Sequence, residues 1–348
     1  MSVADRKDAH LTLCLTEQVE PGGADASGFG ALRFDHDALP EIDLAAVRTD
    51  VELLGKRLAA PLVVGAMTGG TPRAGEVNRR LAAAAARCGV AFALGSQRRM
   101  LQDPAARDSY AVRDAAPDLP LLFGNLGAVQ LNYGVGASEV RRLVQEVGCD
   151  AFMFHLNPLQ EAIQPEGDTR FSGLLPKLRA IVPEVGVPVL VKEVGSGISE
   201  TTARKLRELP LAGVETSGVG GTSWAKVESL RAGDPLRRSV GELFSRWGIP
   251  TAESVATCRR VLPDRVVIAS GGIRNGIEAA KALALGADAV AIALPFLKAA
   301  DRSADAVVAE IERVVAELRT AMFLTGCATV GELRSRRLVA ARDLTALP

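Results

Sequence analysis

The sequence predicts an α/β fold, a (β/α)8 TIM barrel preceded by an N-terminal arm. Apolar runs of strand length recur eight times from residue 61 onward, separated by segments with helical spacing. The runs are apolar at nearly every position, which is typical of parallel strands covered on both faces. A double glycine follows the seventh run, whereas an open doubly wound sheet, the main competitor, carries its glycine-rich loop after the first strand. These observations favour a closed parallel barrel.

Length and composition are consistent with one barrel plus extensions. The 348 residues are 48% hydrophobic, which is enough to bury a large core. Lys plus Arg and Asp plus Glu each number 41, so no broad charge attracts nucleic acid or an anionic membrane. The five cysteines are widely spaced, which indicates reduced thiols, and no uncharged apolar run reaches the length of a membrane span. We therefore expect a soluble cytoplasmic protein with neither a nucleic-acid nor a membrane partner.

Residues 1–57 differ from the rest of the chain and form the predicted arm. They are polar and include a flexible insert, Pro-Gly-Gly-Ala-Asp-Ala-Ser-Gly, at 21–28. The residues alone favour a solvated tail. The barrel domain is expected to occupy 58–348.

Strand-length runs and capping residues define the predicted elements of the barrel. Thr71-Pro72 begins the helix after the first strand and Gly89 ends it, while Ser138 caps another helix that stops at Gly148. Ser199 opens the helix after the fifth strand. The strands are expected at 61–67, 91–96, 120–125, 151–156, 188–193, 213–217, 266–270 and 289–294.

Two further segments complete the outer layer. The connection from Gly218 to Pro250 is unusually long before the next helix begins near Thr251, and long loops in compact domains often act as lids. The segment Ala304–Leu324 is amphipathic and is expected to close the outer ring of helices.

The segment from Val266 to Leu294 predicts a ligand as well as a fold. Its two apolar strands flank a helix at Ile277–Leu285, which Gly286 terminates. Gly271-Gly272 leaves the end of the first strand without side chains, so backbone N–H groups can approach a phosphate closely. The phosphate site of (β/α)8 barrels lies after strands seven and eight, which is where this turn is expected.

Polar groups follow almost every predicted strand, at the face where such barrels hold their chemistry. Packing does not explain polar ends at seven or eight strands, although each of them has a structural explanation by itself. The strand ends read Ala66-Met67-Thr68-Gly69-Gly70, Gly95-Ser96-Gln97-Arg98, Gly124-Asn125, His155-Leu156-Asn157-Pro158-Leu159-Gln160-Glu161, Lys192-Glu193 and Thr216-Ser217-Gly218, followed by the two phosphate turns at Gly271-Gly272 and Ala293-Leu294.

Together these motifs resemble those of type 2 isopentenyl-diphosphate isomerases. The similarity spans most of the chain, from Arg6-Lys7-x-x-His10 to Leu324-Thr325-Gly326. The double glycine is shared by many FMN-binding barrels, whereas the arm motif and the block from His155 to Gly167 are much more specific. The matching segments are Met67-Thr68-Gly69-Gly70-Thr71, Gly95-Ser96-Gln97-Arg98, His155-Leu156-Asn157-Pro158 with Gln160-Glu161, Gln164-Pro165-Glu166-Gly167, Lys192-Glu193, Ser217-Gly218 with Gly220-Gly221-Thr222, and Ser270-Gly271-Gly272-Ile273-Arg274.

The resemblance implies an enzyme that interconverts isopentenyl and dimethylallyl diphosphate, a homoallylic and an allylic diphosphate of isoprenoid biosynthesis. It implies FMN that is active in its reduced form without net redox change, Mg²⁺ bound to the diphosphate, and NADPH as reductant. It also implies a homo-oligomer, a tetramer or an octamer. The arm becomes part of the substrate site rather than a solvated tail.

Site residues follow from the resemblance position by position. The FMN phosphate is expected at Gly271, Gly272, Ala293 and Leu294, with hydroxyls from Ser217 and Thr222, and the isoalloxazine at Ala66, Met67, Thr68, Ser96 and Asn125. The substrate residues are Arg6, Lys7, His10, Ser96, Arg98 and Gln160, and the metal ligand is Glu161. The catalytic residues are Gln160, His155 and Lys192, with Lys192 also binding the cofactor and stabilising negative charge near N1 of the reduced flavin.

Two of these residues have structural alternatives, and the chemistry decides what they can do. Lys192 could simply pair with Glu193, and His155 could be a hydrogen-bonded core histidine. Protonating an alkene is demanding, yet Gln160 does not titrate and His155 is a weak acid for this task. We therefore expect N5 of a reduced flavin, whose anion Lys192 stabilises, to give and take the proton while Gln160 positions or relays it.

Three other functions fit parts of the pattern. An FMN-dependent 2-hydroxy acid dehydrogenase or oxidase shares the double-glycine turn, but it needs a histidine base after strand six or seven, and the only histidines are His10, His36 and His155. A phosphate-barrel dehydrogenase needs a nucleophilic cysteine, which residues 216–224 lack. A barrel that only stores or senses FMN would leave the arm and the polar end of strand four without a role.

Overall fold

Eight parallel strands close into a barrel, as predicted. The computed structural model describes residues 3–21 and 25–340. The hydrogen-bonded order around the barrel is β10-β11-β4-β5-β6-β7-β8-β9. The strands, each of which overlaps its predicted range, are β4 (Leu62–Val64), β5 (Ala91–Ala93), β6 (Leu122–Gly127), β7 (Ala151–Leu156), β8 (Val189–Glu193), β9 (Gly213–Glu215), β10 (Val266–Ser270) and β11 (Ala289–Ile292).

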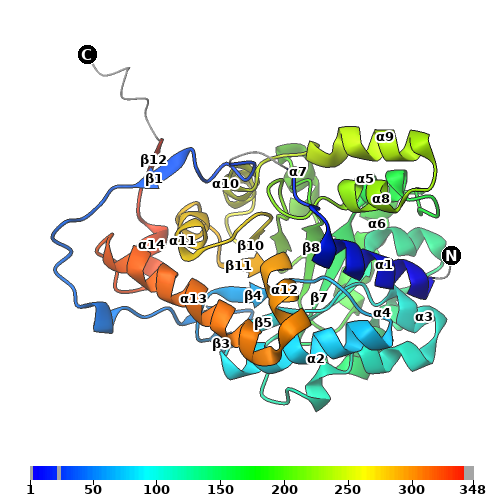
Figure 1. Ribbon diagram of the computed structural model, residues 1–348, viewed down its shortest axis with the longest axis horizontal. Coiled ribbons are helices and arrows are strands. Elements are labelled where there is room, and N and C mark those ends of the chain that lie inside the picture. Colours follow the sequence, from blue (N-terminus) through cyan, green and yellow to red (C-terminus); the bar gives the residue numbers. More distant parts are fainter. Residues whose placement is uncertain (1–2, 22–24, 341–348) are drawn as a thin grey trace.

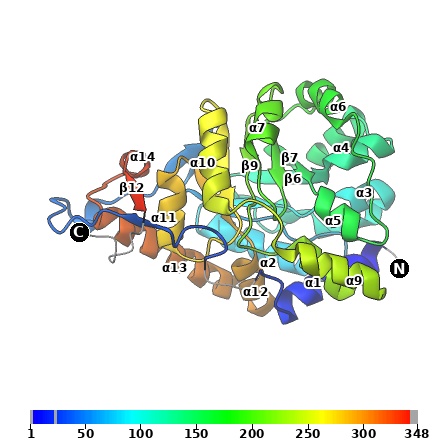
Figure 2. The same ribbon diagram turned by 90° about the horizontal axis from the view of Figure 1, so that it is seen from above.

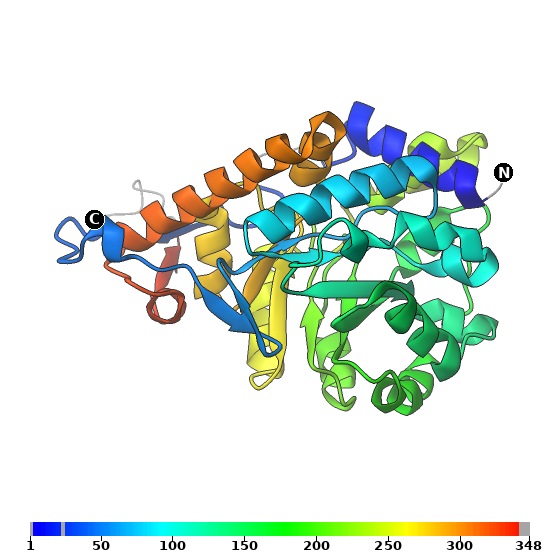
Figure 3. The ribbon, with the colours of Figure 1, turned by 90° about the horizontal axis from the view of Figure 1, so that it is seen from below.

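Helices cover the outside of the barrel (Figure 1), and the two longest, α2 and α13, lie side by side in Figure 3. The helices that follow the strands are α2 (Pro72–Arg87), α4 (Ala137–Val147), α6 (Leu174–Ile181), α7 (Glu200–Arg207), α10 (Thr251–Val261), α11 (Gly276–Ala284) and α13 (Ala304–Phe323). The other elements are α3 (Arg98–Gln102), α5 (Pro158–Ile163), α12 (Leu294–Arg302), α14 (Val330–Arg334) and the antiparallel pair β1 (Leu32–Phe34) and β12 (Leu338–Ala340), with 3-10 turns at 44–46, 104–109, 112–114, 128–133, 182–184 and 244–246.

Most predicted helix ends coincide with capping residues, with one exception. Thr71 and Ser199 cap α2 and α7 through their hydroxyls, as expected. The prediction that Ser138 caps α4 is wrong, because the cap is Gly136, whose N–H donates to the Glu139 carboxylate (2.9 Å). Ser138 lies within the first turn, where its hydroxyl contacts the same carboxylate (3.0 Å).

Side chains that face the barrel axis change from apolar to polar toward the C-terminal ends of the strands. Met153 and Leu190 belong to the apolar cluster inside the barrel. Because alternate residues of a strand share a face, the next inward positions are His155 on β7 and Lys192 on β8. The strand register aligns His155 with Lys192, and Lys192 with Glu215 on β9. These three residues form a polar layer above the apolar core.

A two-stranded hairpin, which the sequence analysis did not predict, closes the other end of the barrel. β2 (Val51–Leu53) and β3 (Lys56–Leu58) pair antiparallel. Leu53 and Leu58 are buried in the same interior cluster as the first residues of β5, β7 and β11. The last part of the predicted arm therefore belongs to the barrel core.

The arm begins with helix α1 (Val3–Thr16), which contacts α2, α8 and α12 and lies between α12 and α9 in Figure 2. Two of its own side chains, Leu11 and Cys14, are buried. The solvated tail favoured by the residues alone is therefore wrong for this helix. Of the insert at 21–28, positions 22–24 lie outside the described residues.

The long connection after β9 is helical rather than an open loop. It contains α8 (Trp224–Arg231) and α9 (Pro235–Leu243), which pack against each other, and α8 also contacts α1 and α5. Together with α1 they cover one side of the barrel mouth. Within the described part of the chain, the helices lack the combination of length and apolar character needed to cross a membrane.

Candidate active site

One pocket at the C-terminal ends of the strands is lined by every predicted site residue. Its empty space, counted together with its open mouth, is about 1340 Å³. The predicted residues that line it are Arg6, Lys7, His10, Ala66, Met67, Thr68, Ser96, Arg98, Asn125, His155, Gln160, Glu161, Lys192, Ser217, Thr222, Gly271, Gly272, Ala293 and Leu294.

The turn after β10 and the start of α12 form the predicted phosphate site. Gly271 and Gly272 have φ angles of 104° and 77°, in the region that favours glycine. The Thr251 hydroxyl donates to the Gly271 carbonyl (2.5 Å) and holds the turn in place. Leu294 opens α12, whose first N–H groups have no partner within the helix. A short extra helix that begins at this position is the usual anion site of such barrels, so these donors fit the phosphate of FMN.

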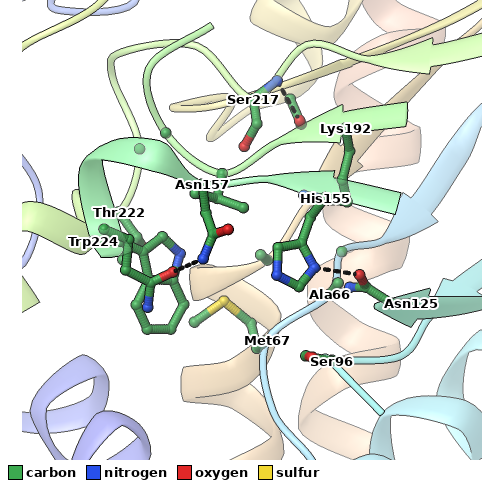
Figure 4. A pocket seen from close by; sticks show the side chains of 18 of the residues that line it. Ala66, Met67, Ser96, Asn125, His155, Asn157, Lys192, Ser217, Thr222 and Trp224 are labelled. Carbon is green, nitrogen blue, oxygen red and sulfur yellow. Dashed lines mark hydrogen bonds between the residues drawn. The ribbon is translucent and has the colours of Figure 1, made fainter. Parts of the chain in front are cut away.

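The ends of β4 and β5 form one wall of the pocket. Ala66, Met67 and Thr68 follow β4, and the Met67 side chain extends toward the centre of the pocket in Figure 4. Ser96 lies next to this segment, and Trp224 faces it from the other side in the same view. A polarizable thioether beside aromatic and small side chains suits a flat aromatic ligand such as isoalloxazine.

Lys192 lies beside His155 at the end of β8 (Figure 4). Its Nζ donates to the Glu193 carbonyl (2.8 Å) and lies 3.4 Å from Oε1 of Glu215. The alternative that pairs Lys192 with Glu193 holds only at this carbonyl, because the Glu193 carboxylate accepts backbone N–H groups from residues 194–196. Burial raises the pKa of Glu193 to about 7 in spite of those donors. The ammonium retains a further donor for a ligand.

His155 is held as a neutral imidazole. Its Nδ1 lies 2.8 Å from Oδ1 of Asn125, whose amide nitrogen donates to the Leu94 carbonyl (2.9 Å; Figure 4). This arrangement assigns the proton to Nδ1 and leaves Nε2 as an acceptor. Burial, and then the charges of Lys192 and Lys7, lowers the pKa of His155 to about 3. His155 is hydrogen-bonded and largely buried, as the structural alternative expected, but it also lines the pocket.

Three cationic side chains meet at the mouth of the pocket, Arg6 and Lys7 from α1 and Arg98 from α3. Lys7 Nζ donates to the Ser96 carbonyl (2.8 Å) and to the Tyr110 hydroxyl (3.0 Å). Burial, and then the charges of the neighbouring arginines, lowers the pKa of Lys7 to about 7. A cluster whose members destabilise one another's charge is suited to a polyanion such as a diphosphate.

A fully buried carboxylate, that of Glu228 on α8, connects the arm to the pocket. His10 Nε2 lies 3.0 Å from Oε1, and the amide nitrogens of Gln160 (3.2 Å) and Gln164 (3.0 Å) donate to the same oxygen. Arg231 Nε donates to Oε2 (2.8 Å). Burial by itself would raise the pKa of Glu228, but the bonds to His10 and Arg231 outweigh it and hold that pKa below its usual value. Gln160 is thus oriented by a charged partner.

Glu161 lies near Arg6 with both carboxylate oxygens hydrogen-bonded. Asn157 Nδ2 donates to Oε1 (2.8 Å) and the Asp168 N–H to Oε2 (2.6 Å). Burial raises the pKa of Glu161. Among the described residues no group of three or more histidine, cysteine or carboxylate side chains could hold a metal. Mg²⁺ therefore fits here only as a shared ion, with one protein carboxylate and the remaining ligands from a diphosphate and water.

Sequence reasoning missed several groups of the site. Glu215 reads as part of an apolar strand, although a charge in such a run, at the inward position beside Lys192, was an available signal. Glu228 reads as an ordinary polar residue of a helix, and its burial has no local signal. Further lining residues that were not predicted are Gln130, Asn157, Gln164, Trp224, Ser270 and Arg274.

Comparison with known proteins identifies the family of this site. Residues 158–340 match the family model of the FMN-dependent dehydrogenases. A Synechococcus protein named isopentenyl-diphosphate delta-isomerase is 48% identical over 96% of this chain and 95% of its own length. Proteins of the same name from Rickettsia bellii and Stutzerimonas stutzeri are 45% and 44% identical, over 96% and 97% of this chain and the same shares of their own lengths. The chain belongs to the isopentenyl-diphosphate delta-isomerase family, in its FMN-dependent form.

Solved structures agree with this family at the level of the fold. A mandelate oxidase with 3,3-difluoro-2-hydroxy-3-phenylpropionic acid has a TM-score of 0.66 at 21% identity, covering 98% of this chain and 99% of that one. A lactate oxidase from Pediococcus acidilactici has a TM-score of 0.68 at 16% identity, covering 92% and 86%. Identities this low show the shared barrel fold alone and carry no argument about cofactor or substrate.

Replacing Gly272 with valine is expected to abolish FMN retention. A Cβ at this position would lie 2.5 Å from backbone atoms of Gly220, at a φ of +77°. The side chain would push apart the two turns of the phosphate site, rather than block the phosphate directly. Flavin absorbance per chain after gel filtration measures the effect, and circular dichroism reports the fold. Gly233→Val, where a Cβ meets open space, should keep its flavin; stoichiometric flavin in folded Gly272→Val would contradict the assignment.

Proposed function

We propose that this isomerase interconverts isopentenyl and dimethylallyl diphosphate with reduced FMN as its acid–base group, with Mg²⁺ on the diphosphate and without net redox change. The observation that carries the proposal is the neutral His155, whose pKa of about 3 removes it as an acid near neutral pH. Gln160, the other side chain expected at the reacting end, does not titrate. Reduced FMN supplies the missing acid and base when it is bound.

The residues around the flavin site support this role. Lys192 offers positive charge at the expected position of N1, where it favours the anion of the reduced ring. Gln160 accepts from Asn157 Nδ2 (3.1 Å) and donates to Glu228 (3.2 Å), so its amide is held in one orientation next to the substrate space. His155 presents an unprotonated Nε2, which can accept a hydrogen bond but cannot protonate an alkene.

The mouth of the pocket supports a diphosphate. Arg6, Lys7, His10 and Arg98 supply donors from two helices, and Glu161 supplies a carboxylate for the Mg²⁺ that the diphosphate carries. Because α1 provides three of these donors, the arm acts both as part of the substrate site and as a cover that excludes water. NADPH as reductant, the homo-oligomer and the cytoplasmic location remain predictions.

A 2-hydroxy acid oxidase is the second candidate because those enzymes share the fold. It requires a histidine that removes a proton beside the flavin. His10 on α1 pairs with Glu228, His36 is exposed, and His155 is held by Asn125. None of them follows the sixth or seventh barrel strand.

Isomerisation should depend on the redox state of the flavin. The oxidised enzyme is expected to be inactive, and photoreduction under anaerobic conditions should activate it with no reductant consumed per turnover. Gln160→Ala should lower turnover by roughly a hundredfold or more, the scale of losing one acid–base participant, and leave flavin reduction intact. Gln145→Ala, an exposed residue of α4, is the matched control. Equal rates with oxidised and reduced flavin would refute the proposal.

Removing the charge of Glu161 should weaken the binding of Mg²⁺ and leave the binding of FMN unchanged. Glu161→Gln is expected to keep FMN but to raise the Mg²⁺ concentration for half-maximal activity by about tenfold or more, since a charged contact contributes roughly 1.5–3 kcal/mol. A Mg²⁺ titration of the reduced enzyme measures this. Glu312→Gln, exposed on α13, should match the unaltered protein. An unchanged titration would remove Glu161 from the metal site.

Substrate binding should take up a proton at Lys7. The pKa of the unliganded side chain is about 7, so at about pH 8 it is mostly neutral, and an anionic diphosphate favours its charged form. Calorimetry at about pH 8 in two buffers of different ionisation enthalpy should show uptake that disappears at about pH 6, where Lys7 is already charged. Lys7→Arg keeps a fixed charge and should lose this uptake. Equal uptake in both proteins would contradict the contact.

A further inference from the structure

The carboxylate of Glu215 is a feature of the pocket that the proposed mechanism does not use. The residue is only 3% exposed but lines the pocket. Its Oε1 accepts from the Ser270 hydroxyl (2.8 Å) and lies 3.4 Å from Lys192 Nζ. Its Oε2 is buried and has no hydrogen-bond partner among the described residues. A buried charged oxygen without a partner is costly, so a donor from a ligand is expected at this carboxylate.

The hydrogen bonds around Glu215 show why protein groups do not supply that donor. The Ser217 N–H donates to Ser270 Oγ (3.0 Å), so the Ser270 proton is directed to Oε1 of Glu215. Lys192 approaches the same oxygen and gives its other bond to the Glu193 carbonyl. Both protein donors therefore converge on Oε1, and the carboxylate keeps acceptor capacity on Oε2.

The position of Glu215 indicates which part of FMN it meets. Around the barrel, β9 lies between β8, which carries Lys192, and β10, which leads into Gly271-Gly272. Lys192 is the expected partner of the ring edge at N1, and the glycine turn is the expected partner of the phosphate. The ribityl chain joins these two parts of the cofactor and therefore passes in front of β9. The ring edge at N1 and C2 offers acceptors, whereas the ribityl chain offers hydroxyl donors that match a carboxylate.

We infer that Glu215 binds FMN by accepting a hydrogen bond from a hydroxyl of the ribityl chain. The inference rests on the FMN site of the proposed function and adds the group that selects a flavin carrying a polyhydroxyl chain. It gives the unpartnered oxygen a donor and keeps Ser270 and Lys192 in their present bonds. A hydrogen bond to a buried carboxylate is among the stronger neutral-to-charged contacts in proteins.

A purely structural role for Glu215 makes a different prediction. If the carboxylate only positions Lys192, its removal would alter the flavin midpoint potential and weaken all flavins by the same factor. If it binds the ribityl chain, its removal would erase the preference for one particular hydroxyl. The effects of substituting Glu215 and of removing one ribityl hydroxyl on the free energy of binding should therefore be additive in the first case and non-additive in the second.

Equilibrium binding to the apoprotein tests the inference without any turnover. The ligands are FMN and analogues that each lack one ribityl hydroxyl, and the proteins are the unaltered chain, Glu215→Gln and Glu215→Ala, with fluorescence quenching as the readout. In the unaltered protein, one analogue should bind about tenfold to a hundredfold more weakly than FMN, and in Glu215→Ala the same analogue should bind nearly as well as FMN. Glu193 is a neighbouring buried residue whose carboxylate accepts backbone N–H groups, so Glu193→Gln serves as the control. In this variant the same analogue should bind more weakly than FMN by the same factor as in the unaltered protein.

Each alternative outcome has a defined meaning. Equal losses for every analogue in the unaltered protein and in Glu215→Ala would overturn the inference and leave Glu215 as a positioning residue for Lys192. Failure of the unaltered apoprotein to bind FMN would instead refute the cofactor, and with it the proposed function. If Glu215→Ala does not fold by circular dichroism, the near-isosteric Glu215→Gln carries the comparison, and an unchanged analogue loss there would equally overturn the inference.

Discussion

The buried charge of Glu228 is the constraint on which the arrangement of the site depends. A carboxylate with no exposure to solvent has to be compensated by neighbouring donors, and its neighbours come from different parts of the chain. His10 comes from the arm and Gln160 from α5, which follows the fourth barrel strand, while Arg231 lies one turn along the same helix as Glu228. Compensation of one charge thus brings α1, the Gln160 amide and the helical connection after β9 to one place.

The barrel and most of the site were predictable because both follow from short-range patterns. Strands covered on both faces are apolar throughout, so their positions were visible, and closure places all their C-terminal ends on one face. Residues as distant in sequence as Met67 and Lys192 were therefore expected together, and both line the same pocket. The turn at Gly271 and Gly272 was also predictable, since few residues other than glycine adopt its positive φ angles.

The groups that were missed depend on contacts between distant segments. Glu228 belongs to a helix whose sequence gives no sign that its carboxylate meets an arm more than two hundred residues earlier in the chain. Leu53 and Leu58 lie in short apolar stretches of a mostly polar region, so their sequence does not indicate burial. They are buried because they pack inside the barrel. Ser138 is not the cap because α4 begins before it, at the N-cap Gly136, whose N–H donates to the Glu139 carboxylate.

The hairpin of β2 and β3 gives the barrel two unlike ends. Leu53 and Leu58 fill the base of the barrel with apolar side chains. The opposite end carries the polar layer of His155, Lys192 and Glu215 and the cationic residues of α1 and α3, all of which line one pocket. A ligand seated on the polar layer and one held by the cationic residues would therefore share a single pocket whose floor is polar and whose supporting core is apolar.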